Sequence, residues 1–159
     1  MKIEIEWQQP ILLSKNKRLI NSENVLPHVP TGPGVYFFSR KFGLSFSPFY
    51  VGETMNLRGR IKSHLNNADI RDILRGITVP SVQIRQGNKF LHCGKFVAKR
   101  GLNAKRSLEV VQRYLIQRAL ADGSALLNKQ LTVIRTHQVT FSGKKQGRAG
   151  YPRTLHVPI

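Results

Sequence analysis

Four side chains that can act on a phosphodiester fall within residues 34–64. Tyr36 and Tyr50 are separated by fourteen positions, and Arg60 and His64 follow at a separation of four. Residues four apart project from the same face of a helix, so the arginine and the histidine are expected side by side. An arginine can neutralise charge that grows on a phosphate, while a phenol or an imidazole can handle the proton of the attacking water. The set therefore predicts phosphodiester hydrolysis.

Two short strands and one helix must hold these side chains together. A turn at residues 31–34 leads into a strand at residues 35–38, and a second strand covers residues 49–51. Asn56 is the expected N-cap of a helix whose apolar face carries Leu57, Ile61 and Leu65. If the two strands pair as a hairpin, both tyrosines lie beside the start of this helix.

The rest of the pattern is that of a small α+β domain. Residues 79–85 predict a third strand, and residues 86–107 predict a basic loop with a candidate strand at 90–97. Ser107 is the expected N-cap of a long helix that ends near Ala121, and residues 131–140 predict a last strand. This order predicts a small central, mainly antiparallel sheet flanked by helices.

Composition narrows the classes of partner. The 159 residues include 26 Lys and Arg against 8 Asp and Glu, which gives a net charge of +18. Such a charge favours a polyanionic partner, with nucleic acid first and an anionic membrane surface second. The single cysteine, Cys93, excludes an internal disulfide, and no apolar run approaches the ~20 residues of a membrane span. The N-terminus lacks the apolar core of a secretion signal, so we expect a cytoplasmic protein with no membrane partner.

Residues 34–64 resemble the GIY-YIG nuclease family, which includes excision-repair nucleases, homing endonucleases and some type II restriction enzymes. Gly34-Val35-Tyr36 and Tyr50-Val51-Gly52 correspond to the two halves of the family name, and residues 56–60 match the stretch that ends at its catalytic arginine. The likeness covers roughly residues 31–130. It implies a DNA endonuclease on a GIY-YIG-like fold. Its catalytic residues would be Tyr36, Tyr50, Arg60 and His64, with Gly34 and Gly52 in structural roles.

The resemblance also implies one divalent ion, Mg²⁺ or Mn²⁺, held by a helical glutamate three residues before a Leu-Ile pair. Here Leu115-Ile116 is the pair, so Gln112 occupies the glutamate position. A hard dication prefers carboxylate oxygen, and an amide oxygen is a weaker ligand. Three alternatives remain open: an inactivating Glu→Gln change, a natural relative that binds DNA with lost or reduced cleavage, or rescue by Glu109 one turn earlier. In each of the first two, this chain is inactive or impaired.

The family mechanism assigns a role to each site residue. Tyr36, rather than Tyr50, is expected to act as or assist the base for water, and His64 is expected to relay a proton or contact phosphate. Tyr50 and Arg60 would orient the phosphate, and the ion at position 112 would support the leaving oxygen. An unperturbed tyrosine titrates near 10, so a phenol base needs a lowered pKa. Glu53 either helps to hold the metal or pairs with a neighbouring arginine, Arg58 or Arg60, and we expect the pairing.

The chain is expected to divide into three regions. Residues 1–30 form an N-terminal extension with a strand at 2–7 and an irregular segment. Residues 31–140 form the nuclease-like domain, and residues 141–159 form a basic tail that is disordered or extended. We expect the basic side chains of the loop and the tail to follow phosphates beside the site. The expected nucleic-acid contacts are Arg58, Lys62, Lys95, Lys99, Arg100, Lys105, Arg106, Asn128, Lys144 and Lys145.

Other functions fit the same composition. The main alternative is a non-catalytic nucleic-acid-binding module on the same fold, and a more distant one is an RNA- or ribosome-binding basic protein. The small size favours a restriction or defence enzyme over an excision-repair subunit. Duplex, single-stranded and branched DNA remain open as substrates, and cutting both strands of a palindrome would favour a homodimer.

Overall fold

The computed structural model describes residues 1–77, 82–128, 136–140, 142, 143 and 154–158. In this part of the chain the main sheet has six strands in the order β3-β2-β6-β4-β5, and β1 pairs with β6 beside β2. Every pairing within it is antiparallel. The strands are β1 (Ile5–Trp7), β2 (Ile11–Lys15), β3 (Arg18–Leu19), β4 (Gly34–Phe42), β5 (Ser45–Thr54) and β6 (Asn88–Phe96).

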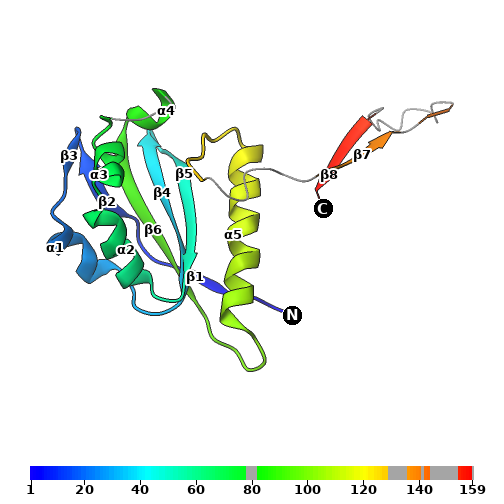
Figure 1. Cartoon of the computed structure of the whole chain (residues 1–159), viewed down its shortest axis with the longest axis horizontal. Coiled ribbons are helices and arrows are strands. Elements are labelled where there is room, and N and C mark those ends of the chain that lie inside the picture. The colour runs from blue at the N-terminus through cyan, green and yellow to red at the C-terminus, as the bar shows by residue number, and fades with distance from the viewer. Residues whose placement is uncertain (78–81, 129–135, 141, 144–153, 159) are drawn as a thin grey trace.

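Helices cover both faces of this sheet, so the predicted fold class, a mainly antiparallel α+β sheet flanked by helices, is confirmed. Figure 1 shows α2 and α3 on one face and α5 on the other. The helices are α1 (Ser22–Val25), a short 3-10 turn at Leu26–His28, α2 (Leu57–Asn66), α3 (Ala68–Leu74), α4 (Val82–Arg85) and α5 (Ala104–Ala121). None of the helices in the described ranges has the length and apolar character needed to cross a bilayer.

Strand β4 separates two cores because its side chains alternate between the faces of the sheet. Tyr36 and Phe38 join the larger core, together with Ile61 of α2. Val35 points to the opposite face and forms the smaller core with Leu108 of α5. The sheet therefore holds Tyr36 against α2 while α5 packs behind it.

The β4–β5 hairpin fixes the relative positions of the two tyrosines. Tyr36 lies opposite Gly52 and Phe38 lies opposite Tyr50, after which the register shifts. The shift leaves Phe49 as an extra residue in β5, and its side chain joins the larger core. Residues 39–48 complete the hairpin, so both strands are longer than the predicted 35–38 and 49–51.

The N-terminal residues belong to the main sheet. The strand predicted within residues 2–7 is confirmed, but the prediction of an irregular segment is wrong for residues 11–19, which form β2, a turn and β3. β2 starts with three successive apolar residues, Ile11 to Leu13, and its lack of alternation hid the strand. Asn16 and Lys17 adopt positive φ angles and form the tight turn into β3.

Two further predictions are corrected. The strand predicted at 79–85 is wrong for Val82–Arg85, which form α4, while residues 79–81 lie outside the described ranges. Alternation over four residues resembles a strand, but Pro80 suits the approach to a helix better than a central strand. The candidate strand at 90–97 is confirmed as β6, which starts two residues earlier.

The long helix also begins earlier than predicted. Its N-cap is Asn103, whose side chain accepts a hydrogen bond from the backbone of Arg106, and not Ser107. The Ser107 hydroxyl instead donates back to the Asn103 carbonyl at 2.8 Å.

At the other end of the chain, β7 (Thr136–Thr140) and β8 (Thr154–Pro158) pair as a separate two-stranded sheet. β7 confirms the predicted strand for residues 136–140, while residues 131–135 lie outside the described ranges. β8 is a paired strand within the tail that was expected to be disordered or extended.

Candidate active site

A buried contact between Tyr36 and His64 forms the centre of the site. The Tyr36 hydroxyl lies 2.8 Å from His64 Nε2, and the two rings are 5.5 Å apart. Tyr36 is 1% exposed and His64 is 7% exposed. Position 36 comes from the start of β4 and position 64 from the last turn of α2, so the packing of this helix on the sheet creates the contact.

Arg60 joins the same cluster from one turn earlier on α2. Its Nε donates to the Tyr36 hydroxyl at 3.4 Å, while the residue as a whole is exposed. The helix start is fixed by Asn56, whose side chain accepts from the backbone of Gly59 at 3.1 Å. The sequence prediction that Tyr36, Arg60 and His64 lie together is therefore confirmed in geometry.

These contacts favour one direction for the protons. A guanidinium can only donate, so the Tyr36 oxygen accepts from Arg60 and its own proton points to His64 Nε2. That arrangement requires a neutral imidazole with its proton on Nδ1. Burial, with a smaller contribution from the charge of Arg60, lowers the pKa of His64 to about 4, which keeps the ring neutral at physiological pH.

Tyr36 is poorly suited to ionise. Burial raises the pKa of its phenol above the ordinary value, and the hydrogen bond from Arg60 offsets this only in part. The phenol contacts in turn raise the pKa of Arg60, so the guanidinium stays charged. Tyr36 therefore positions Arg60 and His64 more readily than it supplies a phenolate base.

Tyr50 is the more accessible of the two phenols. It is half-buried, and its ring lies 6.3 Å from that of Tyr36 and 5.5 Å from that of His64. Of the four aromatic and basic site residues, Tyr50 and Arg60 are thus the two whose side chains can meet a solvent-borne phosphate, and the other two support them from beneath.

Asn128 and Gln112 converge on the backbone of Val51. Asn128 Oδ1 accepts from Val51 N at 3.0 Å, and its Nδ2 donates to Val51 O at 2.7 Å. Gln112 Nε2 donates to the same carbonyl at 3.4 Å. Both amides therefore hold the strand between Tyr50 and Gly52, and a carboxylate at position 112 could not donate this bond.

Glu53 and Glu109 are brought together although they are 56 positions apart. Burial raises the pKa of Glu53, and the nearby Glu109 carboxylate raises it further, against smaller opposing effects of Lys105 and Arg60. The expected pairing of Glu53 with an arginine is wrong, because within the described residues no cation lies within ion-pair distance of it. Arg58 instead donates to the Val29 carbonyl at 3.0 Å.

This pair has the chemistry of a partial site for a hard dication. No group of three or more His, Cys, Asp or Glu suited to a metal occurs among the described residues. Mg²⁺, however, is usually held by one or two carboxylates, with waters and substrate phosphate completing its shell. Gln112 uses its nitrogen on Val51, which leaves its oxygen as a weak additional ligand, so the donor set fits such an ion. Sequence reasoning considered the two glutamates singly, since only the packing of α5 on β5 brings Glu109 close enough to influence the pKa of Glu53.

The predicted nucleic-acid contacts are distributed around the molecule. Lys62 lies exposed on α2, Lys95 lies exposed on β6, and Arg100, Lys105 and Arg106 are exposed on the way into α5. Lys99 forms an exposed ion pair with Glu4 at 2.6 Å, a contact of small energetic weight. Lys144 and Lys145 lie outside the described residues. Gly34 and Gly52 both lie where a Cβ would overlap neighbouring atoms, in keeping with their structural assignment.

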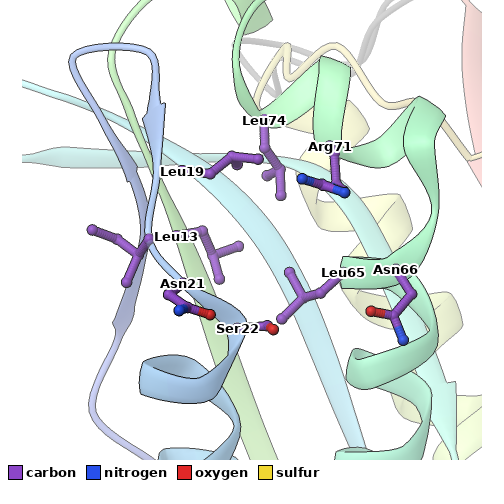
Figure 2. A pocket seen from close by; sticks show the side chains of 9 residues that line it. Leu13, Leu19, Asn21, Ser22, Leu65, Asn66, Arg71 and Leu74 are labelled. Carbon is purple, nitrogen blue, oxygen red and sulfur yellow. The ribbon is translucent and has the colours of Figure 1, made fainter.

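A pocket of about 340 Å³ lies away from the Tyr36 cluster. Figure 2 shows Leu65 from α2 and Leu74 from α3 opposite Leu13 and Leu19, with Arg71 at one side. Its size is at the lower end for ligand pockets, and none of the predicted site residues lines it. It is therefore separate from the candidate active site.

No protein-family model, curated protein or solved structure matches this chain. The resemblance to GIY-YIG nucleases accordingly remains a prediction. It is carried by the motif residues and by the way in which the fold assembles them.

Proposed function

We propose that the chain is a metal-dependent DNA endonuclease of the GIY-YIG type whose cleavage is impaired because Gln112 occupies the metal-ligand position. The observation that carries the proposal is the cluster of Arg60, Tyr36 and His64. A buried phenol that links a guanidinium to a neutral imidazole is more than phosphate binding requires, because a solvated arginine binds phosphate without such support.

Each residue has a distinct role in the proposed reaction. Arg60 is the exposed cation and stabilises the charge that develops on the phosphate. Tyr36 orients the guanidinium, and its proton is held by His64. Tyr50 is the accessible phenol, so we assign the orientation of the attacking water to Tyr50 and not to the buried Tyr36. Asn128 and Gln112 position this phenol through the backbone of Val51.

The metal requirement rests on the acidic pair. Glu53 and Glu109 would hold one Mg²⁺ or Mn²⁺, which would supply positive charge to the scissile phosphate. Burial, and after it the charge of Glu109, raises the pKa of Glu53, which supports this assignment because a dication would stabilise the charged form of Glu53.

A non-catalytic DNA-binding module is the second candidate. It is favoured by Gln112 itself, because its amide donates to Val51 and fits this position as a structural residue. Under this alternative the predicted nucleic-acid contacts would bind DNA, and no metal would be needed.

Plasmid cleavage decides between the two. The chain and its Gln112→Glu variant are incubated with supercoiled and single-stranded DNA in Mg²⁺ or Mn²⁺, with Arg60→Ala in each background. We expect Gln112→Glu to cut DNA at least 100-fold faster than the parent chain. Adding Arg60→Ala to Gln112→Glu should lower its cleavage rate about 100- to 1,000-fold. Arg75→Ala, which removes an exposed arginine at the end of α3 that is not among the predicted DNA contacts, is the matched control and is expected to retain cleavage.

The other outcomes are equally informative. Equal cleavage by the parent chain and Gln112→Glu would assign the metal to Glu53 and Glu109 alone. DNA binding by both proteins without cleavage by either would contradict the endonuclease proposal and favour the binding module.

A further inference from the structure

The face of the sheet opposite Tyr36 carries a group of aromatic side chains, which we call the aromatic face. Alternation along β4 directs Phe37 away from Tyr36, and His92 of β6 lies directly opposite Phe37. The register of the neighbouring strands brings further rings to the same face. The members of the aromatic face are Trp7, Phe37, Phe46, Phe90 and His92.

The rings of the aromatic face are in continuous contact. Phe37 and His92 stack with centroids 4.1 Å apart, and Trp7 contacts Phe37 edge-on at 5.4 Å. Phe46 contacts His92 at 4.8 Å and Phe90 at 5.2 Å. The group therefore forms one surface that spans strands β1, β4, β5 and β6.

Part of this surface is open to solvent. Trp7 is 45% exposed and Phe46 is 37% exposed, while Phe37 and Phe90 are half-buried. The core beneath α5 is built from other side chains of the same sheet face, among them Val35, which packs with Leu108 of α5. Single exposed apolar residues are ordinary, but a contiguous aromatic patch marks a binding surface.

The electrostatic surroundings favour an anionic occupant. Lys41 Nζ lies 5.3 Å from the centre of the Phe46 ring and 5.9 Å from that of Phe90. No Asp or Glu occurs in residues 24–52 or 73–108, which contain all of β4 and β6 and most of β5. Burial lowers the pKa of His92 to about 4, so its ring is neutral and supports Phe37 and Phe46 from within the face without adding a charge.

We propose that the aromatic face binds unpaired bases of single-stranded DNA, with Trp7 and Phe46 as the stacking residues and Lys41 beside the adjoining phosphates. The choice of DNA rests on the proposed function and narrows its substrate to DNA that has a single-stranded segment. Sheet aromatics flanked by cations are a recurrent way to bind unpaired nucleotides, since every base presents a π-face. The preference for base sequence is therefore weak.

Trp7 is the one tryptophan of the chain, so its fluorescence reports directly on this surface. The full chain is titrated with a dT oligonucleotide and with a hairpin duplex of equal phosphate number, at fixed salt. We expect the single strand to quench Trp7 and the duplex to quench it far less. Phe46→Ala is expected to weaken single-strand binding about 5- to 150-fold, as for the loss of one stacking partner.

A matched control separates stacking from a general loss of aromatic surface. Tyr114 is 61% exposed on α5, away from the aromatic face, and Tyr114→Ala is expected to leave binding unchanged. Trp7→Ala, measured by anisotropy of a labelled oligonucleotide, should reproduce the loss seen with Phe46→Ala. Circular dichroism of each variant checks that the sheet is intact.

Three results would overturn the inference. Oligonucleotide binding that leaves both Trp7 fluorescence and the Phe46→Ala affinity unchanged would show that bases do not stack here. Quenching by anionic vesicles but not by oligonucleotides would assign the face to a membrane surface, and strong preference for RNA would reject DNA. Cleavage by Gln112→Glu is measured independently, so a failure of stacking and a failure of the endonuclease proposal remain distinguishable.

Discussion

The ring of Tyr36 lies directly over Gly52, its cross-strand partner in the β4–β5 hairpin. A Cβ at position 52 would overlap the Cζ and hydroxyl of Tyr36. The two halves of the sequence motif are therefore a single packing unit, in which the second glycine makes room for the first tyrosine.

Gly52→Ala tests this packing unit. The added methyl must push the Tyr36 phenol away from His64, so we expect a loss of about 1–3 kcal/mol in the free energy of unfolding. In the Gln112→Glu background, DNA cleavage should fall as well, because Arg60 loses its support. Urea denaturation and plasmid cleavage measure the two effects, with Ser45→Ala in the same strand as the control. Wild-type values for both quantities would contradict the close approach.

Asn128→Ala removes both hydrogen bonds that clamp Val51. Each such bond contributes about 0.5–1.5 kcal/mol, so we expect unfolding to become easier by about 1–3 kcal/mol. The Tyr50 phenol loses its backbone support, and cleavage by the Gln112→Glu variant should decline without a change in single-strand stacking at Trp7. Asn66→Ala, an exposed amide at the end of α2, serves as the control. Equal stability of the two variants would mean that the clamp is dispensable.

Stability should fall as the pH is lowered from about 7 to 4. Burial is the main cause that lowers the pKa values of His64 and His92 in the folded protein to about 4, from an ordinary value of 6.5. Between these limits the unfolded chain binds more protons than the folded chain, so protonation favours unfolding. Once the pH is below both the folded and the unfolded pKa, each histidine is expected to have lowered the free energy of unfolding by about 3 kcal/mol.

Urea denaturation at pH 7.5, 6.0 and 5.0 checks this dependence. His92→Gln, which cannot titrate, should flatten the profile by roughly half, whereas substitution of the exposed His28 should leave it unchanged. A midpoint that stays constant between pH 7.5 and 5.0 would show that neither ring is held neutral.

The elements around the motifs were the easiest to predict. Turn residues and strand-forming side chains located parts of β4 and β5, and the apolar spacing of Leu57, Ile61 and Leu65 located α2. The separation of four correctly placed Arg60 and His64 on one face of a helix, because this spacing is local to the helix. Both side chains contact Tyr36 from that face.

The failures concern relationships that are not local. β2 starts with three successive apolar residues, two of which contribute to the larger core, and so shows no alternation, and its tight turn uses Asn16-Lys17 without a glycine. The contact of Gln112 with Val51 and the approach of Glu53 to Glu109 depend on how α5 docks on β5. Neither the sequence spacing nor the residue types give the angle at which α5 packs on β5. The closeness of Glu53 and Glu109, on which the proposed metal site depends, could therefore not be derived before the fold.

The hydrogen bonds of Asn128 to Val51 have a second effect, on association between molecules of this protein. β5 is the outermost strand on its side of the sheet, and an open edge exposes N–H and C=O groups that can recruit a strand from another molecule. Leu127 N donates to Phe49 O at 2.7 Å, and Asn128 occupies both polar groups of Val51. The segment that steadies Tyr50 thereby seals this edge, and the protein is protected there from edge-to-edge aggregation.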